Sequence, residues 1–293
     1  MASKPTPIQG RAGLPAGRRV AAAVDEAWTG LFHTGADLHI PASVVAALTL
    51  CGRRDPDGPD PAVAVAQLDT GELAELLRNI WRGFVLYRAD LAVRVMPLVG
   101  WLYEQPSDWQ LEGARTVARA ALRAGVMDLP AHPDDRRGTD VFGELLQHMR
   151  SHRTKAGRGE FYTPLPVAEL LADIGGVAEL QDGQSLLEPT AGTGVMLCAA
   201  AQTLRRQGRD PAAITWYAND IDPITAACLA VNAHLWGLGW NVLIGCANGL
   251  DQEWPEQARQ DRAASITAVR SVQAVAQLRR LEQALQINMT GSR

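Results

Sequence analysis

Apolar residues recur at helical spacing through the first half of the chain. One predicted helix presents them on a single face: Leu73, Leu76, Leu77, Ile80, Phe84, Leu86 and Tyr87. A second helix begins at a capping box formed by Ser107 and Gln110 and ends at Gly125. A third helix begins near Asp140. Because no strand pattern interrupts this spacing, we predict that the chain is mostly helical up to about residue 160.

The pattern changes after Thr163, which is predicted to cap a helix that starts at Pro164 and stops at Gly175 and Gly176. Short apolar runs then alternate with helical stretches: strands over 185–188, 214–219 and 241–246, and helices over 195–207 and 223–235. This alternation is typical of a parallel sheet with helical crossover connections. We therefore predict the α/β fold class, with a helical N-terminal domain ahead of the sheet.

We divide the chain into four parts on this basis. Residues 1–19, rich in Pro, Gly and Arg, are predicted to form a flexible arm, and residues 20–155 a helical domain. Residues 156–256 are predicted to form the α/β domain, and residues 257–293 a helical tail. The tail has apolar residues at helical spacing: Val272, Val275, Ala276, Leu278, Leu281 and Leu285. We expect it to pack on its own sheet or on a partner.

Composition narrows the class of protein. The 293 residues include 28 Lys and Arg against 32 Asp and Glu, a net charge of −4, which excludes binding to nucleic acid through overall positive charge. Hydrophobic residues make up 47% of the chain, which is enough for a sizeable core. No apolar run approaches the ~20 residues of a membrane helix, and no signal-peptide pattern is present. The four cysteines fit neither a disulfide framework nor a zinc pattern. We expect a cytoplasmic protein without a membrane partner.

Four motifs lie in or beside the predicted α/β domain. In chain order they are F-Y-T-P at 161–164, E-P-T-A-G-T-G at 188–194, N-D-I-D-P at 219–223 and A-N-G-L at 247–250. The last three follow the three predicted strands directly. Because the carboxyl ends of parallel strands meet at one edge of a sheet, we expect these motifs to form a cofactor pocket there.

The residue types in these motifs indicate which cofactor the pocket takes. Gly192 and Gly194 allow the backbone to approach a ligand closely. Asp220 is suited to accept hydrogen bonds from both hydroxyls of a ribose, and Asn248 to bond an adenine edge. Glu188 would repel a pyrophosphate but favours an ammonium group. Ribose, adenine and ammonium without phosphate describe S-adenosyl-L-methionine better than a nicotinamide dinucleotide.

In this order, the four motifs resemble those of the adenine-N6 DNA methyltransferases, of the kind found as modification subunits of type I restriction systems. The usual forms in that family are F-[FY]-T-P, D-P-x-x-G-[ST]-G, E-x-D and G-D-[ST]-L. The stretch D-V-F-G-E-L-L from Asp140 also looks like the helix that leads into F-Y-T-P in the family. Glu188 and Asn248 depart from the family pattern, which has Asp at both places. The resemblance covers about residues 138–254 and implies an incomplete Rossmann-like methyltransferase domain that depends on S-adenosylmethionine.

The resemblance also implies cofactor-binding residues and partners. Phe161 and Thr163 would line the wall of the pocket. The methionine end of the cofactor would be held by Glu188, Pro189 and the turn Gly192–Gly194. Asp220 would hold the ribose, and the adenine would lie against Ile221 or Asp222 and against Asn248. The implied partner is DNA, and in this family separate regions or subunits read the target sequence.

The catalytic motif of the family, N-P-P-[FY], has no counterpart, because the chain contains no Asn-Pro pair. In that motif an Asn side chain and a Pro carbonyl bond the adenine amino group, and the aromatic ring stacks on the flipped base. We therefore assign no catalytic residue and predict that this chain alone transfers no methyl group to DNA. The strand at 185–188 would then be an exposed sheet edge, covered either by the tail or by a second chain that completes the sheet.

Other interpretations stand beside these. Asp222 before Pro223 is also a typical helix N-cap. Glu144, His148 and His152 share a helix face but lack further ligands, so we assign no metal site. A basic group precedes the pocket and could contact phosphates or simply be solvated: Arg136, Arg137, Arg150, Arg153, Lys155 and Arg158. The alternative functions are a non-catalytic module that binds DNA or a partner and, less favoured by Glu188, a nicotinamide-dependent oxidoreductase.

Overall fold

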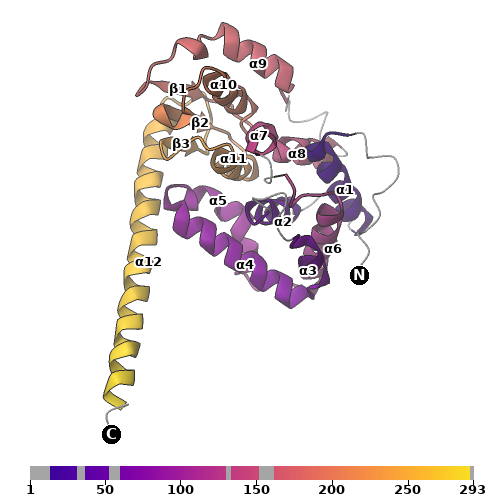
Figure 1. Cartoon of the computed structure of the whole chain (residues 1–293), viewed down its shortest axis with the longest axis vertical. Coiled ribbons are helices and arrows are strands. Elements are labelled where there is room, and N and C mark those ends of the chain that lie inside the picture. Colours follow the sequence, from indigo (N-terminus) through magenta and orange to yellow (C-terminus); the bar gives the residue numbers. More distant parts are fainter. Residues whose placement is uncertain (1–13, 32–36, 53–59, 130–132, 152–161, 291–293) are drawn as a thin grey trace.

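The computed structural model describes residues 14–31, 37–52, 60–129, 133–151 and 162–290, and only the backbone at 133–135, 151 and 281–290. Its first half is helical (Figure 1). The helices are α1 (Ala16–Leu31), α2 (His39–Leu50), α3 (Ala62–Gln67), α4 (Thr70–Tyr87), α5 (Ala92–Val99), α6 (Asp108–Arg123), α7 (Pro133–Gly138) and α8 (Val141–Ser151). Short 3₁₀ turns η1 (Ala89–Leu91) and η2 (Gly100–Leu102) flank α5. The predicted helical N-terminal region is confirmed.

Capping residues determine where these helices start and stop. At the start of α6, the Ser107 N–H donates a hydrogen bond to Gln110 Oε1 at 2.9 Å, as the capping box predicts. Gly125 follows the helix with a φ of 88°. The start of α4 has a second capping box, in which Asp69 and Glu72 each accept the other's backbone N–H.

The second half contains a three-stranded sheet. Its elements are α9 (Leu165–Ile174), η3 (Val177–Glu179), β1 (Ser185–Glu188), α10 (Val195–Arg206), η4 (Pro211–Ala213), β2 (Thr215–Asn219), α11 (Pro223–Leu235), β3 (Val242–Gly245) and α12 (Trp254–Thr290). The strands pair in the order β1-β2-β3, and both pairs are parallel. The predicted strands and the helices between them are confirmed, and with them the α/β class.

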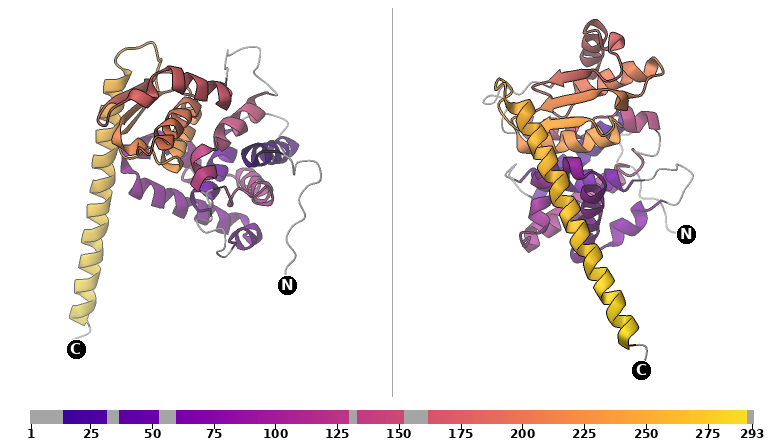
Figure 2. Two further views of the ribbon diagram at one scale, coloured as in Figure 1. Left: turned by 45° about the horizontal axis from the view of Figure 1, so that its top comes forward. Right: turned by 90° about the vertical axis from the view of Figure 1, so that its left-hand side faces the viewer.

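One hydrophobic core joins the two halves of the molecule. It extends from Val20 in α1 to Ile244 in β3 and contains several large, fully buried side chains: Trp28, Trp81, Phe142, Trp216 and Trp236. Helix α11 packs against β3 on one side and against α2 and α5 on the other. Helix α9 packs on α10, away from the N-terminal helices (Figures 1 and 2). The sheet is therefore held directly on the helical region.

The two edges of the sheet have different surroundings. At β3, Trp254 and Ala258 of α12 are buried against Leu243. On the other edge, β1 pairs only with β2 among the described strands, and Leu187 is 54% exposed. Of the two predicted covers for the β1 edge, the tail is therefore the wrong one in the described part of the chain, because α12 packs on β3 through Trp254 and Ala258.

Helix α12 has a packed half and an exposed half. Ser265 donates a hydrogen bond to the Ala89 carbonyl at 2.7 Å, and Arg94 pairs with Asp261. From Arg270 to Arg280 every residue is exposed, and the helix extends away from the rest of the molecule (Figures 1 and 2). The apolar tail residues Val272, Val275 and Leu278 are among these. Side chains at 281 and 285 lie outside the description.

Three predicted boundaries need correction. Helix α1 begins at Ala16, inside the predicted arm 1–19, because Gly17 and Val20 pack in the interface with α8. Helix α12 begins at Trp254, before the predicted tail, because Trp254 is buried against β3. The cap of α9 is Pro164 rather than Thr163, since the Pro164 carbonyl accepts the first helical hydrogen bond, from the Ala168 N–H at 3.0 Å.

No helix among the described residues is both long and apolar enough to cross a membrane. All four cysteines are free thiols, of which Cys198 and Cys228 are buried and the other two partly buried.

Candidate cofactor site at the strand ends

The carboxyl ends of β1, β2 and β3 lie side by side, and Asn219 joins the loops that leave them. Its side-chain amide donates hydrogen bonds to the Pro189 carbonyl at 3.0 Å and to the Ala247 carbonyl at 2.9 Å. Its side-chain oxygen accepts the Ala247 N–H at 3.1 Å. This fully buried residue was missed as a site residue in the sequence, although it is the first residue of N-D-I-D-P.

The turn after β1 contains two glycines with positive φ, 58° at Gly192 and 100° at Gly194. A Cβ on Gly192 would meet nothing within 4 Å, so this residue leaves open space above the turn. A Cβ on Gly194 would lie 2.5 Å from Leu229 Cδ1 and 2.9 Å from the Trp236 ring. The two glycines thus serve different purposes: the backbone at Gly194 packs closely on α11, whereas Gly192 stays accessible.

Asp220 follows β2 and bonds directly to the glycine turn. One carboxylate oxygen accepts the Gly192 N–H at 3.0 Å, and the other accepts the Asp222 N–H at 2.9 Å. Burial raises the pKa of Asp220 above its ordinary value, although these backbone hydrogen bonds oppose the shift. The next residue, Ile221, is 71% exposed. An anionic side chain and an exposed apolar one therefore lie together beside the turn.

The other predicted contacts lie at the same edge. Glu188 is partly buried, and its Oε1 accepts hydrogen bonds from the backbone N–H and the hydroxyl of Thr190, both at 3.1 Å. The side chain of Asn248 is exposed and accepts the Leu250 N–H at 3.1 Å. Leu250 is 90% exposed. Glu188 and Asn248 thus each form hydrogen bonds within their own loop, and each has lone pairs left that can accept a hydrogen bond from a ligand.

Asp222 caps helix α11, as its place before Pro223 predicts. Its Oδ1 accepts the Thr225 N–H at 2.8 Å and pairs with Arg150 at 2.9 Å. Burial alone would raise the pKa of Asp222, but these contacts outweigh it, and the pKa lies below its ordinary value. Arg150, one of the predicted phosphate-contacting residues, is therefore used inside the protein. Arg153, Lys155 and Arg158 lie outside the described residues.

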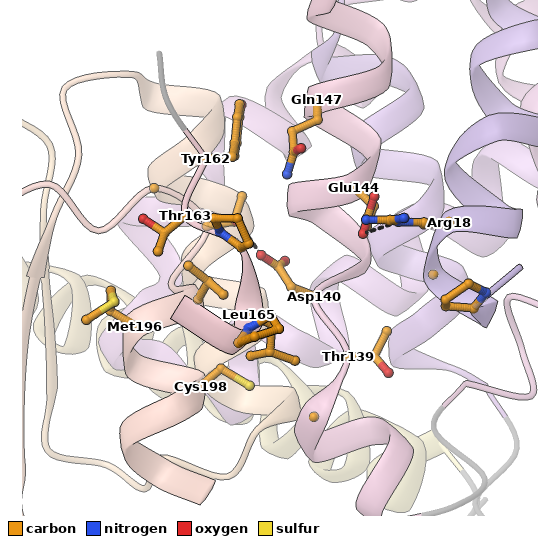
Figure 3. Close-up of a pocket in the computed structure, with 18 of the residues that line it drawn as sticks. Arg18, Thr139, Asp140, Glu144, Gln147, Tyr162, Thr163, Leu165, Met196 and Cys198 are labelled. Atoms are coloured by element: carbon orange, nitrogen blue, oxygen red, sulfur yellow. Dashed lines mark hydrogen bonds and ion pairs between the residues drawn. The ribbon is translucent and has the colours of Figure 1, made fainter. Parts of the chain in front are cut away.

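A pocket of about 520 Å³ lies on the α8 side of the glycine turn (Figure 3). Its lining comes from the start of α1, from 138–140 and α8, from 162–166 and from 190–198. Thr163 and Gly192 are the predicted site residues that line it. Glu188, Asp220 and Asn248 are instead at the strand ends, and Phe161 lies outside the described residues.

Residues 137–269 match the model of the family described as N-6 DNA Methylase. This part of the chain is therefore similar to the N-6 DNA methylase family. The segment 137–269 is called the methylase segment below.

Two known proteins are similar to the chain. One is the "Type I restriction enzyme MjaIX methylase subunit" of Methanocaldococcus jannaschii, 28% identical over 113 residues, which are 38% of this chain and 20% of that protein. The chain therefore spans about a fifth of the length of this relative. The other is the crystal structure of the type I restriction-modification system methyltransferase subunit from Streptococcus thermophilus, with 17% identity and a TM-score of 0.49. The match covers 82% of this chain and 60% of the chain in the crystal structure.

The methylase segment includes a second site residue that sequence reasoning missed, Asp140. It follows α7 and lines the pocket (Figure 3). Thr193 of the glycine turn donates a hydrogen bond to it at 2.6 Å. In the sequence, D-V-F-G at 140–143 indicates a helix start and resembles the lead-in helix of the family, but it does not single out Asp140 as a site residue.

Glu144, one turn further along α8, pairs with Arg18 of α1 at 2.9 Å. It does not belong to a metal site in the described part of the chain, where no three His, Cys, Asp or Glu side chains are grouped to hold an ion. His152 lies outside that part. Two of the charged residues that line the pocket, Arg18 and Glu144, are therefore paired with each other.

Proposed function

We propose that the chain binds S-adenosylmethionine at the strand ends of its methylase segment, as the cofactor-binding part of an adenine-N6 DNA methyltransferase. The observation that carries the proposal is the link between Asp220 and Gly192, which sets a carboxylate beside an open glycine turn. The match of residues 137–269 to the N-6 DNA methylase family supports the same cofactor.

The residues at the strand ends fit this cofactor. Gly192 has open space where any other residue would have a Cβ, so a ligand can contact the turn. Asp220 has lone pairs left after its two backbone hydrogen bonds, which suit ribose hydroxyls. Ile221 and Leu250, at 71% and 90% exposure, offer apolar surface for a flat base. Glu188 would attract the cofactor's ammonium group.

We propose further that Thr163 contributes to the cofactor site from the neighbouring pocket. It lines that pocket together with Gly192, so a ligand held at the turn would extend toward it. Phe161, Pro189, Gly194 and Asn248 stay predictions of the family resemblance. The cofactor would supply an activated methyl group, and the role of this chain is to bind and orient it.

Methyl transfer needs residues that this chain does not carry. The adenine amino group requires hydrogen-bond acceptors such as the Asn and Pro of N-P-P-[FY], and the chain has no Asn-Pro pair. Loss of one positioned polar group commonly costs ~10²–10³ in rate, and here the whole set is absent. We therefore propose that the chain alone is inactive on DNA and that a partner supplies the acceptor side.

The partner would join the uncovered edge of the sheet. Strand β1 has an unpaired edge among the described strands, with Leu187 exposed. Helix α9 has exposed apolar side chains: Leu165, Val167, Leu170, Leu171 and Ile174. A polypeptide that adds a strand to β1 would satisfy the edge and cover this surface. DNA would then be bound by the assembly in the cytoplasm.

The experiment is calorimetric titration of the purified chain with S-adenosylmethionine. We expect saturable binding that Asp220→Ala abolishes and that Asp69→Ala, a helix-cap change far from the site, leaves intact. Tritiated cofactor and unmethylated DNA then test turnover, and we expect no methyl incorporation above a blank. A parallel titration with NADH tests the oxidoreductase alternative. If neither S-adenosylmethionine nor NADH binds, the proposed methyltransferase function fails and the chain is a non-catalytic binding module.

A further inference from the structure

Asp140 joins three elements of the methylase segment through one carboxylate. Its Oδ1 accepts the Gly143 N–H at 2.9 Å, which caps α8, and the Asn232 side-chain amide of α11 at 2.8 Å. Its Oδ2 accepts the Thr193 hydroxyl of the glycine turn at 2.6 Å. Helix α8, helix α11 and the turn are therefore fixed to the same side chain.

Gly143 leaves room for the hydrogen bond between Asp140 and Thr193. A Cβ at Gly143 would lie 2.3 Å from Asp140 Oδ2 and 2.9 Å from Thr193 Oγ1. Any residue other than glycine at this position would push the carboxylate and the hydroxyl apart. The glycine three residues after Asp140 is thus required by the hydrogen bond between the two side chains, rather than by helix geometry.

The backbone of Thr193 is held as well as its side chain. Asn232 donates a hydrogen bond to the Thr193 carbonyl at 2.8 Å. The next residue, Gly194, packs against Leu229 of α11 and against Trp236, which follows that helix. The turn is thus bound on one side to α11 and on the other to the start of α8, while the Gly192 face stays open.

We propose that Asp140 is a positioning residue for the cofactor turn: it holds Thr193 so that the Gly192 backbone is fixed for ligand contact. This inference rests on the proposed binding of S-adenosylmethionine at that turn. The carboxylate accepts all three hydrogen bonds, and the Thr193 hydroxyl is the one donor among them that can also accept, so an amide at this position could reverse that contact, whereas an alanine removes it. Because Glu144 of the same helix pairs with Arg18 of α1, the turn is linked through α8 to the N-terminal helices.

The test uses variants that break the contact from either end. We expect Asp140→Ala and Thr193→Val each to weaken S-adenosylmethionine binding by about tenfold or more, the size of one charge-assisted hydrogen bond. Thr193→Ser keeps the hydroxyl and should restore affinity. The double variant should bind S-adenosylmethionine no more weakly than the weaker-binding of the two single variants, because both substitutions remove the same contact. Asp69→Ala, at the cap of α4, is the matched control.

A second readout keeps the proposal independent of the cofactor. Hydrogen exchange of the Gly192 and Gly194 amides in the free protein should accelerate about tenfold in Thr193→Val, whereas amides in α4 should not change. Wild-type affinity and wild-type exchange in Thr193→Val would overturn the positioning role. If the wild type binds no S-adenosylmethionine but the variant still shows faster exchange, the proposed function fails, and Asp140 positions the turn for another ligand.

Discussion

The Asp220 carboxylate accepts the Gly192 N–H at 3.0 Å and thereby joins the end of β2 to the turn after β1. These residues are 28 positions apart in the sequence and come together because β1 and β2 are parallel neighbours. The contact orients the carboxylate at the surface where a ligand would meet the turn. It also determines how the site should respond to pH.

We expect cofactor affinity to fall on acidification at a higher pH than an ordinary aspartate would cause. Burial raises the pKa of Asp220, so its carboxyl gains a proton, and loses the charge that attracts ribose hydroxyls, before an exposed carboxyl does. Asp222 has a lowered pKa and stays charged over this range. Titration calorimetry between pH 7 and pH 4 measures the effect. If the affinity stayed constant until the pH at which exposed carboxyls gain a proton, the result would contradict this prediction.

The two glycines of the turn should respond differently to alanine. Gly194→Ala combines a φ of 100° with a collision against Leu229, so we expect a loss of about 2–5 kcal/mol in the free energy of unfolding. Gly192→Ala has open space and a φ of 58°, so the loss should be ~1–2 kcal/mol. Its main effect should be weaker cofactor binding. Urea unfolding and calorimetry separate the two, and equal stability losses would show that packing on α11 is unimportant.

Loss of Arg150 should destabilise the protein more than loss of a surface arginine. Arg150 and Asp222 have side chains only 10% and 21% exposed, and removing one partner leaves the other charge partly buried. We expect Arg150→Ala to lower the free energy of unfolding by about 2–4 kcal/mol. The control is Arg206→Ala, whose pair with Asp173 is more than half exposed and should contribute under ~1 kcal/mol. Comparable losses in both variants would contradict the buried role of Arg150.

Helix α12 should stabilise the fold through its first half only. Trp254 is 4% exposed against β3, so Trp254→Ala should cost ~3–5 kcal/mol. Val272 and Leu278 are 66% and 61% exposed, so changing both to Ser should leave the melting temperature within a degree or two. Thermal unfolding followed by circular dichroism gives both values. A large loss on changing the exposed pair would mean that this half packs on a second molecule.

The sequence alone determined most of the helices and strands. Alternating apolar runs and glycine stops predict the three strands and the helices between them, because these signals are local. The order of the four motifs likewise identified the methylase segment, and the cap at Asp222 followed from its place before Pro223. Boundaries such as Ala16 and Trp254 were missed because burial against distant elements extends those helices.

Tertiary structure decided which residues act together. Sequence spacing could not show that Asp140 bonds Thr193, 53 residues away, or that Arg150 pairs with Asp222 rather than with solvent. Nor could it show that α12 covers β3 and leaves β1 open, since an amphipathic helix fits any apolar surface of the right width. The physical reason is the same in each case. Hydrogen bonds and packing between distant segments depend on where the parallel sheet and α11 bring them, and no local pattern records that.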